Sequence, residues 1–278
     1  MFTERTKEHP YTTWADIQWH KGEGNVRRVQ ERLYRATRNQ AGRKGKNLQQ
    51  VLVRAPSNTL LAIRRMTQEN QGRHTAGMDG GVYDTPEARG KVLQEDLSLQ
   101  GYTPQPVRRV DIPQDHGKHR PLGIPTGKDR VMQAIGKAAL EPEGEARCAA
   151  NSSGLRPGRG TREAMEAMFK ATSRQDGRPG VLDAEMSGGF DHIDHNPLVA
   201  HVPVCTTTLR QWLKAGGVDV GFVSPTDTGT PQGGVMSPGL AHGALEGMER
   251  VFDAAYAEGR PTSPVHRRGL NTGRASMR

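Results

Sequence analysis

The chain has 278 residues, of which 33% are hydrophobic and 5% are aromatic, and it carries a formal net charge of +9 at pH 7. This length accommodates one large domain or two small ones, and the low apolar content limits the core to a modest size. The charge favours an anionic partner, nucleic acid first, with a merely basic soluble protein as the alternative. No apolar run approaches the ~20 residues needed to cross a bilayer, so we expect no membrane partner.

Cysteine usage and the N-terminal segment bear on location. Cys148 and Cys205 are the only two cysteines, and they lie far apart, without the spacing of a disulfide framework. Residues 1–20 are polar and charged and lack the apolar stretch of a secretory signal. These features predict a cytoplasmic protein.

The N-terminal part is predicted to be helical and basic. Apolar residues recur at helical spacing over residues 26–41. The basic side chains of this run include Arg27, Arg28, Arg32, Arg35 and Arg38, and the candidate RNA-binding residues are Arg27, Arg28, Arg32, Arg35 and, just beyond the run, Lys44. A solvated helix face and an RNA-contacting surface explain such a run equally well. A second helix is predicted over 47–66, followed by a polar, glycine-rich loop over 71–84.

The middle of the chain is predicted to contain a strand and two helices. Alternating residues over 106–112 indicate a strand, and a turn follows at 114–118. Thr126 and Asp129 resemble a capping box at the start of a helix that we expect to be limited by Pro142. Thr161 opens another helix, and the stripe of Met165, Met168 and Phe169 is predicted to be buried.

The last third combines carboxylates with glycine-rich turns. Residues 179–186 predict a short strand that carries Asp183 and Glu185, and a short helix is predicted around Trp212. The glycine-rich turn over 229–235 precedes Ser237, the predicted N-cap of a helix reaching residue 252. Residues 259–278 contain no acids and no periodicity, and we interpret them as a basic disordered tail.

These motifs, in this order, resemble the reverse transcriptase domain of group II intron-encoded reverse transcriptase/maturases. The resemblance covers about residues 14–252. The blocks that carry it are 14–19 with the basic helix after it, 62–65 through 75–80, 118–126 with 128–130, 151–159, the Phe190-Asp191 motif, and Pro231-Gln232-Gly233-Gly234.

The resemblance implies Mg²⁺-dependent, RNA-directed DNA polymerisation and binding of intron RNA for splicing and mobility. Carboxylates would hold two Mg²⁺ ions about 4 Å apart. Glu185 stands at the position of a metal-binding aspartate, and Asp183 shares its face of the strand, so these two are the candidate catalytic and metal-binding residues. The implied partners are group II intron RNA and a DNA primer.

The resemblance also assigns the substrate-binding residues. Arg120 would clamp the nucleotide triphosphate, because a guanidinium suits phosphate, and Lys118 would partly replace a family lysine whose position is Gln114 here. Phe190 matches the aromatic residue beneath the incoming sugar. Gln232 and Gly233 would let the backbone approach nucleotide and template.

Departures from the family pattern predict loss of polymerase activity. Glu185 adds a methylene where Mg²⁺ geometry is strict, and residues 253–278 contain no Tyr-Ala-Asp-Asp motif. Several positions that the family fills with large apolar residues carry small or different ones here: Gly144, Cys148, Ser153, Leu155, Gly239 and Gly243.

Together these observations predict an α+β fold of reverse transcriptase fingers with an incomplete palm. The expected division is a basic helical extension over 1–80, fingers and partial palm over 81–258, and the tail over 259–278. The first hypothesis is a truncated, polymerase-deficient group II intron reverse transcriptase/maturase. The alternatives are a non-catalytic intron-RNA-binding module and a decayed gene product. The sequence leaves oligomeric state open.

Overall fold

The computed structural model describes residues 13–114, 117, 119–149, 152–173, 188–202, 206–219 and 222–245. Lys118, the predicted strand over 179–186 with Asp183 and Glu185, the last helix beyond residue 245 and the tail over 259–278 lie outside the described residues. The fold is the predicted mixture of helices and strands, mostly helical with a four-stranded mixed sheet.

The α-helices are α1 (Trp19–Arg38), α2 (Gly42–Arg54), α3 (Pro56–Arg64), α4 (Pro86–Gln94), α5 (Gly127–Arg147), α6 (Thr161–Thr172), α7 (His195–His201), α8 (Thr206–Lys214) and α9 (Ser237–Ala244). Short 3-10 turns cover Trp14–Asp16 and Gln71–His74, and a π-helical turn covers Arg65–Glu69. The strands are β1 (Val107–Pro113), β2 (His119–Ile124), β3 (Gly217–Asp219) and β4 (Phe222–Ser224). No helix of the described residues is long and apolar enough to cross a membrane.

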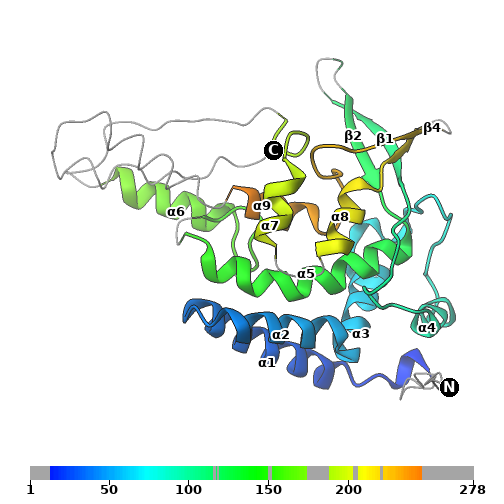
Figure 1. The fold of residues 1–278 in the computed structure, drawn as a ribbon, viewed down its shortest axis with the longest axis horizontal. Coiled ribbons are helices and arrows are strands. Elements are labelled where there is room, and N and C mark those ends of the chain that lie inside the picture. The colour runs from blue at the N-terminus through cyan, green and yellow to red at the C-terminus, as the bar shows by residue number, and fades with distance from the viewer. Residues whose placement is uncertain are drawn as a thin grey trace.

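Helix α5 runs through the centre of the molecule. Helices α1 to α3 lie on one side of it and α7 to α9 on the other (Figure 1), and α5 contacts α1, α2, α3 and α9. Its residues Val131 and Ile135 are fully buried in the larger apolar cluster, while Ala139 belongs to a second cluster shared with α1 and α2. The two halves of the core therefore meet on this helix.

The prediction that Pro142 limits this helix is wrong, because α5 continues to Arg147 with Pro142 buried inside it. A proline has no N–H to donate, so the carbonyl four residues earlier, that of Ala138, loses its helical partner. The side chain of Gln30 on α1 replaces it, since its Nε2 donates to the Ala138 carbonyl at 2.9 Å. A contact between helices thus completes the backbone that the proline interrupts.

The single helix predicted over 47–66 is also wrong, since α2 ends at Arg54 and α3 starts at Pro56. Pro56 occupies the first turn of α3, where its missing N–H costs nothing. Buried Asn58 donates from Nδ2 to the carbonyls of Leu52 (3.0 Å) and Ile135 (3.2 Å). These bonds satisfy a carbonyl released at the break and fasten α3 to α5.

The predicted strand over 106–112 is confirmed as β1. The sheet order is β2-β1-β3-β4, with β1 antiparallel to β2 and parallel to β3. In the β1–β2 pair, Ile112 lies opposite Arg120 and Arg109 opposite Gly123. β3 and β4 have three residues each, too few for alternation to reveal them from sequence.

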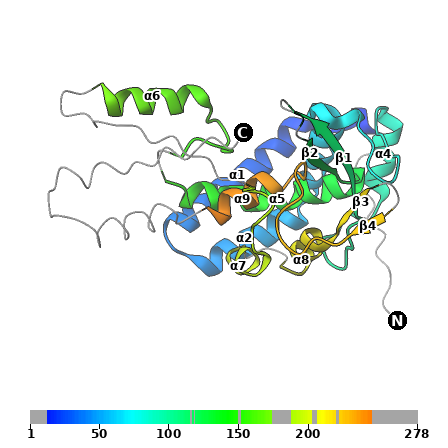
Figure 2. The same ribbon diagram turned by 90° about the horizontal axis from the view of Figure 1, so that it is seen from above.

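The predicted burial of the α6 stripe is wrong. The side chains of Met165 and Phe169 are each 69% exposed and that of Met168 is 51% exposed. Helix α6 stands apart from α5 in both views (Figures 1 and 2). Helical spacing identifies residues that share a face, but it does not say whether another element covers that face.

Replacing Gln30 by Met is expected to destabilise the fold by about 1–2 kcal/mol, because the variant keeps the volume but leaves the Ala138 carbonyl without its donor. Urea unfolding followed by circular dichroism measures this cost. In the Pro142→Ala background residue 142 regains an N–H for that carbonyl, so Gln30→Met should cost much less there. An equal cost in both backgrounds would contradict the assigned role of Gln30.

Candidate nucleotide-binding site

Arg120 on β2 and Gln232 in the glycine-rich loop over 229–235 meet at the outer edge of the sheet. Arg120 Nε donates to Gln232 Oε1 at 2.7 Å, and both side chains are half-buried. Within the described residues Gln232 engages only the Nε of Arg120, so both Nη nitrogens can still bind an anionic ligand. Two predicted substrate-binding residues, more than a hundred positions apart in the chain, therefore touch.

The glycine-rich loop covers part of the β2 edge. The Gly123 N–H donates to the Gln232 carbonyl at 2.6 Å, which fixes the loop beside the strand. A Cβ at Gly233 would lie 2.7 Å from the Gly123 carbonyl oxygen, which is too close for any side chain. The φ of Gly233 is +104°, a backbone conformation that also favours glycine. The absence of a side chain at Gly233 thus brings two segments of protein backbone together.

The turn that carries Phe190 is joined to the same loop through backbone groups. Thr230 N donates to the Phe190 carbonyl at 2.7 Å, and Gly229 N donates to the Ile193 carbonyl at 2.8 Å. Buried His195 contacts the Gly229 carbonyl through Nε2 at 2.7 Å. The Phe190 turn, the glycine-rich loop and β2 therefore form one connected unit.

The start of α9 holds the other end of the loop. Ser237 was predicted as an N-cap, but it lies inside the first turn of α9 and its hydroxyl donates to the Pro231 carbonyl at 2.7 Å. Gln133 on α5 accepts a hydrogen bond from Val235 N at 2.8 Å. The prediction was wrong because this serine binds the preceding loop instead of the helix.

A buried polar network lies at the N-terminal end of α5, one turn before Gln133. Asp129 is 1% exposed and accepts hydrogen bonds from Thr126 Oγ1 (2.6 Å), Gln105 N (3.3 Å) and the Tyr102 hydroxyl. The predicted capping contact is confirmed, since Thr126 Oγ1 also accepts from Asp129 N. Burial raises the pKa of Asp129 despite the hydrogen bonds that lower it.

Arg130 extends this network to the loop that precedes α4. Its guanidinium donates to the carbonyls of Pro125 (3.2 Å), Gly72 (2.9 Å) and Thr75. Asp79 accepts from Gly127 N at 3.3 Å. Sequence blocks that lie some fifty residues apart are thereby held together at the base of the β1–β2 hairpin.

The comparisons with known proteins match this arrangement of motifs. Residues 14–95 match the N-terminal domain of reverse transcriptase. Residues 112–264, more than half of the chain, match reverse transcriptase (RNA-dependent DNA polymerase). The chain belongs to the reverse transcriptase family.

The relatives of this reverse transcriptase chain include a group II intron-encoded protein. It is 34% identical over 213 residues to Protein YkfC of Escherichia coli (strain K12), covering 72% of this chain and 56% of that protein. It is 31% identical over 189 residues to Group II intron-encoded protein LtrA of Lactococcus lactis subsp. cremoris, covering 65% of this chain and 31% of LtrA. The chain spans about half or less of the length of these relatives.

The predicted catalytic and metal-binding residues of this reverse transcriptase chain lie outside the part that the structure describes. Lys118, Asp183 and Glu185 lie outside the described residues, so their roles stay predictions. Among the described residues no group of three or more His, Cys, Asp or Glu side chains could hold a metal ion. The described part therefore supplies no complete Mg²⁺ site.

The predicted RNA-binding residues lie on the exposed side of α1 and at the start of α2. Arg27, Arg28, Arg32, Arg35 and Lys44 are all exposed, whereas the opposite side of α1 is buried in the smaller apolar cluster. Glu31 pairs with Arg27 at 4.0 Å and with Arg35 at 3.8 Å. Contacts as exposed as these are weak, so the arginines remain available to phosphates.

Sequence reasoning missed residues that position the site without touching a ligand. Gln133, His195 and Tyr102 each bond to a segment far away in the chain. A glutamine on an otherwise apolar helix face was the available signal for Gln133, because a buried polar group needs a partner. His195 lies in the segment that follows the Phe190-Asp191 motif, and nothing local marked Tyr102.

Tyr102 is expected to make stability fall at alkaline pH. Burial, followed by the hydrogen bond and charge of Asp129, raises the pKa of Tyr102 above its ordinary value near 10. Above about pH 10 the unfolded chain loses a proton that the folded protein keeps, so the free energy of unfolding decreases as pH rises. Tyr102→Phe should lower stability at pH 8 and flatten this decline.

Denaturant unfolding between pH 8 and pH 11 measures the slope for the wild type, Tyr102→Phe and the control Tyr34→Phe. Tyr34 is 38% exposed and has no part in the Asp129 network. A Tyr102→Phe protein with the wild-type slope would refute the assignment.

Proposed function

We propose that this chain binds group II intron RNA through its N-terminal helices and holds a phosphate-bearing nucleic-acid or nucleotide ligand at the Arg120–Gln232 contact, without polymerising DNA. The supporting observation is the meeting of β2, the glycine-rich loop and the Phe190 turn at one edge of the sheet. The Nη nitrogens of Arg120 and the amide group of Gln232 would donate to the same ligand.

The exposed face of α1 supports the RNA-binding part of the proposal. Arg28, Arg32 and Arg35 follow one another at helical spacing on the side opposite the buried Leu33. A row of guanidiniums at this spacing binds successive phosphates of a structured RNA by electrostatic attraction, with little dependence on base sequence. The name of the relative LtrA, a group II intron-encoded protein, points to intron RNA as the source of that backbone.

The proposed lack of polymerase activity rests on Glu185, which stands where a metal-binding aspartate is expected. Mg²⁺ requires nearly ideal octahedral geometry, and a glutamate places its carboxylate one methylene further from the backbone than the aspartate expected at this position. Holding two ions for in-line displacement depends on that placement.

RNA binding is tested by a filter-binding titration of the 278-residue chain with structured group II intron RNA at several salt concentrations. Changing Arg27, Arg28, Arg32 and Arg35 together to Ala is expected to weaken binding at low salt by ~10-fold or more. The slope of log K against log[salt] should become shallower by roughly 0.7–0.9 for each phosphate whose charge is no longer neutralised.

The matched control changes four exposed cations on α6 and α8, namely Arg162, Lys170, Arg210 and Lys214, to Ala. Both variants remove the same charge, so an effect of net charge alone would weaken both equally. That result, or unchanged affinity in the α1 variant, would refute the proposed surface.

Primer extension tests the second part. The 278-residue chain is expected to add no deoxynucleotides to a primer annealed to RNA in the presence of Mg²⁺. Extension that requires Mg²⁺ and disappears in Asp183→Ala would contradict the proposal, and extension that appears only in Glu185→Asp would support the role given to Glu185. The RNA-binding titration is independent of this result.

A further inference from the structure

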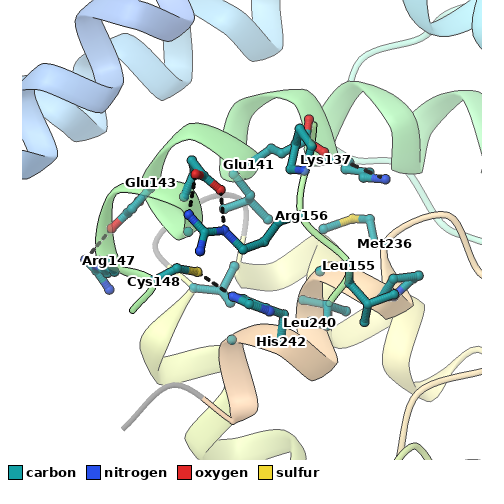
Figure 3. Close-up of a pocket in the computed structure, with 18 residues that line it drawn as sticks. Lys137, Glu141, Glu143, Arg147, Cys148, Leu155, Arg156, Met236, Leu240 and His242 are labelled. Atoms are coloured by element: carbon teal, nitrogen blue, oxygen red, sulfur yellow. Dashed lines mark hydrogen bonds and ion pairs between the residues drawn. The ribbon is translucent and has the colours of Figure 1, made fainter. Parts of the chain in front are cut away.

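A pocket away from the Arg120–Gln232 site lies between the C-terminal half of α5, the segment over 148–157, and α9. Its cavity volume is about 110 Å³. Figure 3 shows its lining. The apolar part of that lining comprises Leu140, Leu155, Pro157, Val202, Met236, Pro238 and Leu240. An apolar cavity of about 150 Å³ holds a benzene-sized molecule, so this one accommodates a small apolar group whose remainder lies at the open mouth.

Three glycines help to create the space. Gly144 on α5 and Gly239 and Gly243 on α9 line the pocket, and a Cβ built at any of them meets no heavy atom within 4 Å. A glycine inside a helix costs about 1 kcal/mol relative to alanine. Because a Cβ at each of these positions would meet open space, a larger side chain there would project into the pocket.

Cys148 and His242 form the reactive part of the lining. The Cys148 thiol contacts Nε2 of His242 across the gap between the end of α5 and α9, and both residues are half-buried (Figure 3). An imidazole nitrogen in contact with a thiol can accept its proton and generate the thiolate, which is the nucleophilic form of cysteine.

The charged residues around the pocket are arranged in pairs. Lys137 pairs with Glu141 at 3.9 Å, Arg147 with Glu143, and Arg156 with Glu145. The Arg156 side chain is 5% exposed, and it also donates to the carbonyls of Ala149 (2.8 Å) and Ser152 (2.6 Å). Because each cation has a carboxylate beside it, the pocket offers no unbalanced charge to attract an ionic ligand.

From these observations we propose that the pocket binds a neutral, apolar small molecule that carries an α,β-unsaturated carbonyl, and that Cys148 adds covalently to it. His242 Nε2 takes the thiol proton, and Sγ forms a bond to the β-carbon of the ligand. The π electrons move to the carbonyl as an enolate, whose α-carbon then takes the proton back from His242. The product is a thioether, with no leaving group and no oxidant.

The test compares neutral and charged electrophiles of one chemistry. The 278-residue chain is treated with N-cyclohexylmaleimide or with a carboxylate-bearing maleimide, and labelling of Cys148 and Cys205 is followed separately by peptide mass. We expect the Cys148-to-Cys205 rate ratio to be ~10-fold higher for the neutral, apolar probe. An equal ratio for both probes overturns the proposal.

Two kinds of variant separate binding from chemistry. His242→Gln should slow Cys148 labelling by ~10-fold or more while leaving Cys205 unchanged, because only the proton acceptor is removed. Gly144→Leu and Gly239→Leu should fill the pocket and abolish the preference for the apolar probe. Circular dichroism confirms that each variant folds, and unchanged Cys148 labelling in folded variants of either kind overturns the proposal.

A saturated analogue measures binding without reaction. N-Cyclohexylsuccinimide lacks the double bond, so it cannot form the thioether. It should raise the thermal unfolding midpoint of the wild type and have no effect on Gly144→Leu. Absence of any shift in the wild type at millimolar concentration would overturn the binding part of the proposal.

Discussion

The structure depends on a central helix that is enclosed by protein along most of its length. Helix α5 contributes to both apolar clusters, so its polar groups cannot rely on water. Gln30 satisfies the carbonyl that Pro142 leaves without a donor, and Gln133 accepts from the backbone of the glycine-rich loop. Each of these bonds attaches a different segment to α5: the first attaches α1, and the second attaches the glycine-rich loop.

The sequence predicted the elements that depend only on residues close together in the chain. The alternation over β1, the Thr126 cap and the helix around Trp212 were found because each depends on neighbouring residues. The failures involve distant partners. The continuation of α5 through Pro142 depends on Gln30 of another helix. The α6 stripe is exposed because no described element covers it, which the sequence of α6 alone cannot reveal. Motif resemblance placed Arg120 and Gln232 in one site, but only the fold revealed that they touch.

The segments that carry the reverse transcriptase motifs are joined to one another mainly by backbone hydrogen bonds. Phe190 is joined to the glycine-rich loop by its carbonyl, and the loop is joined to β2 by the Gly123 N–H. The buried carboxylate of Asp129 supports the N-terminal end of α5, one turn before Gln133. Several blocks that carry the family resemblance therefore coincide with the points where separate segments are joined.

The pairing of β1 with β2 limits how the hairpin can change length. Arg120 lies opposite Ile112 in an antiparallel ladder whose side chains alternate between two faces. A slip of one residue would move Arg120 to the other face of the sheet, where its side chain could not reach Gln232, and would bring His119 or Pro121 to its place. Insertions between the strands are therefore compatible with the site only if they bulge out at the tip. Natural variation in this hairpin should be confined to its turn, with the strand positions themselves unshifted.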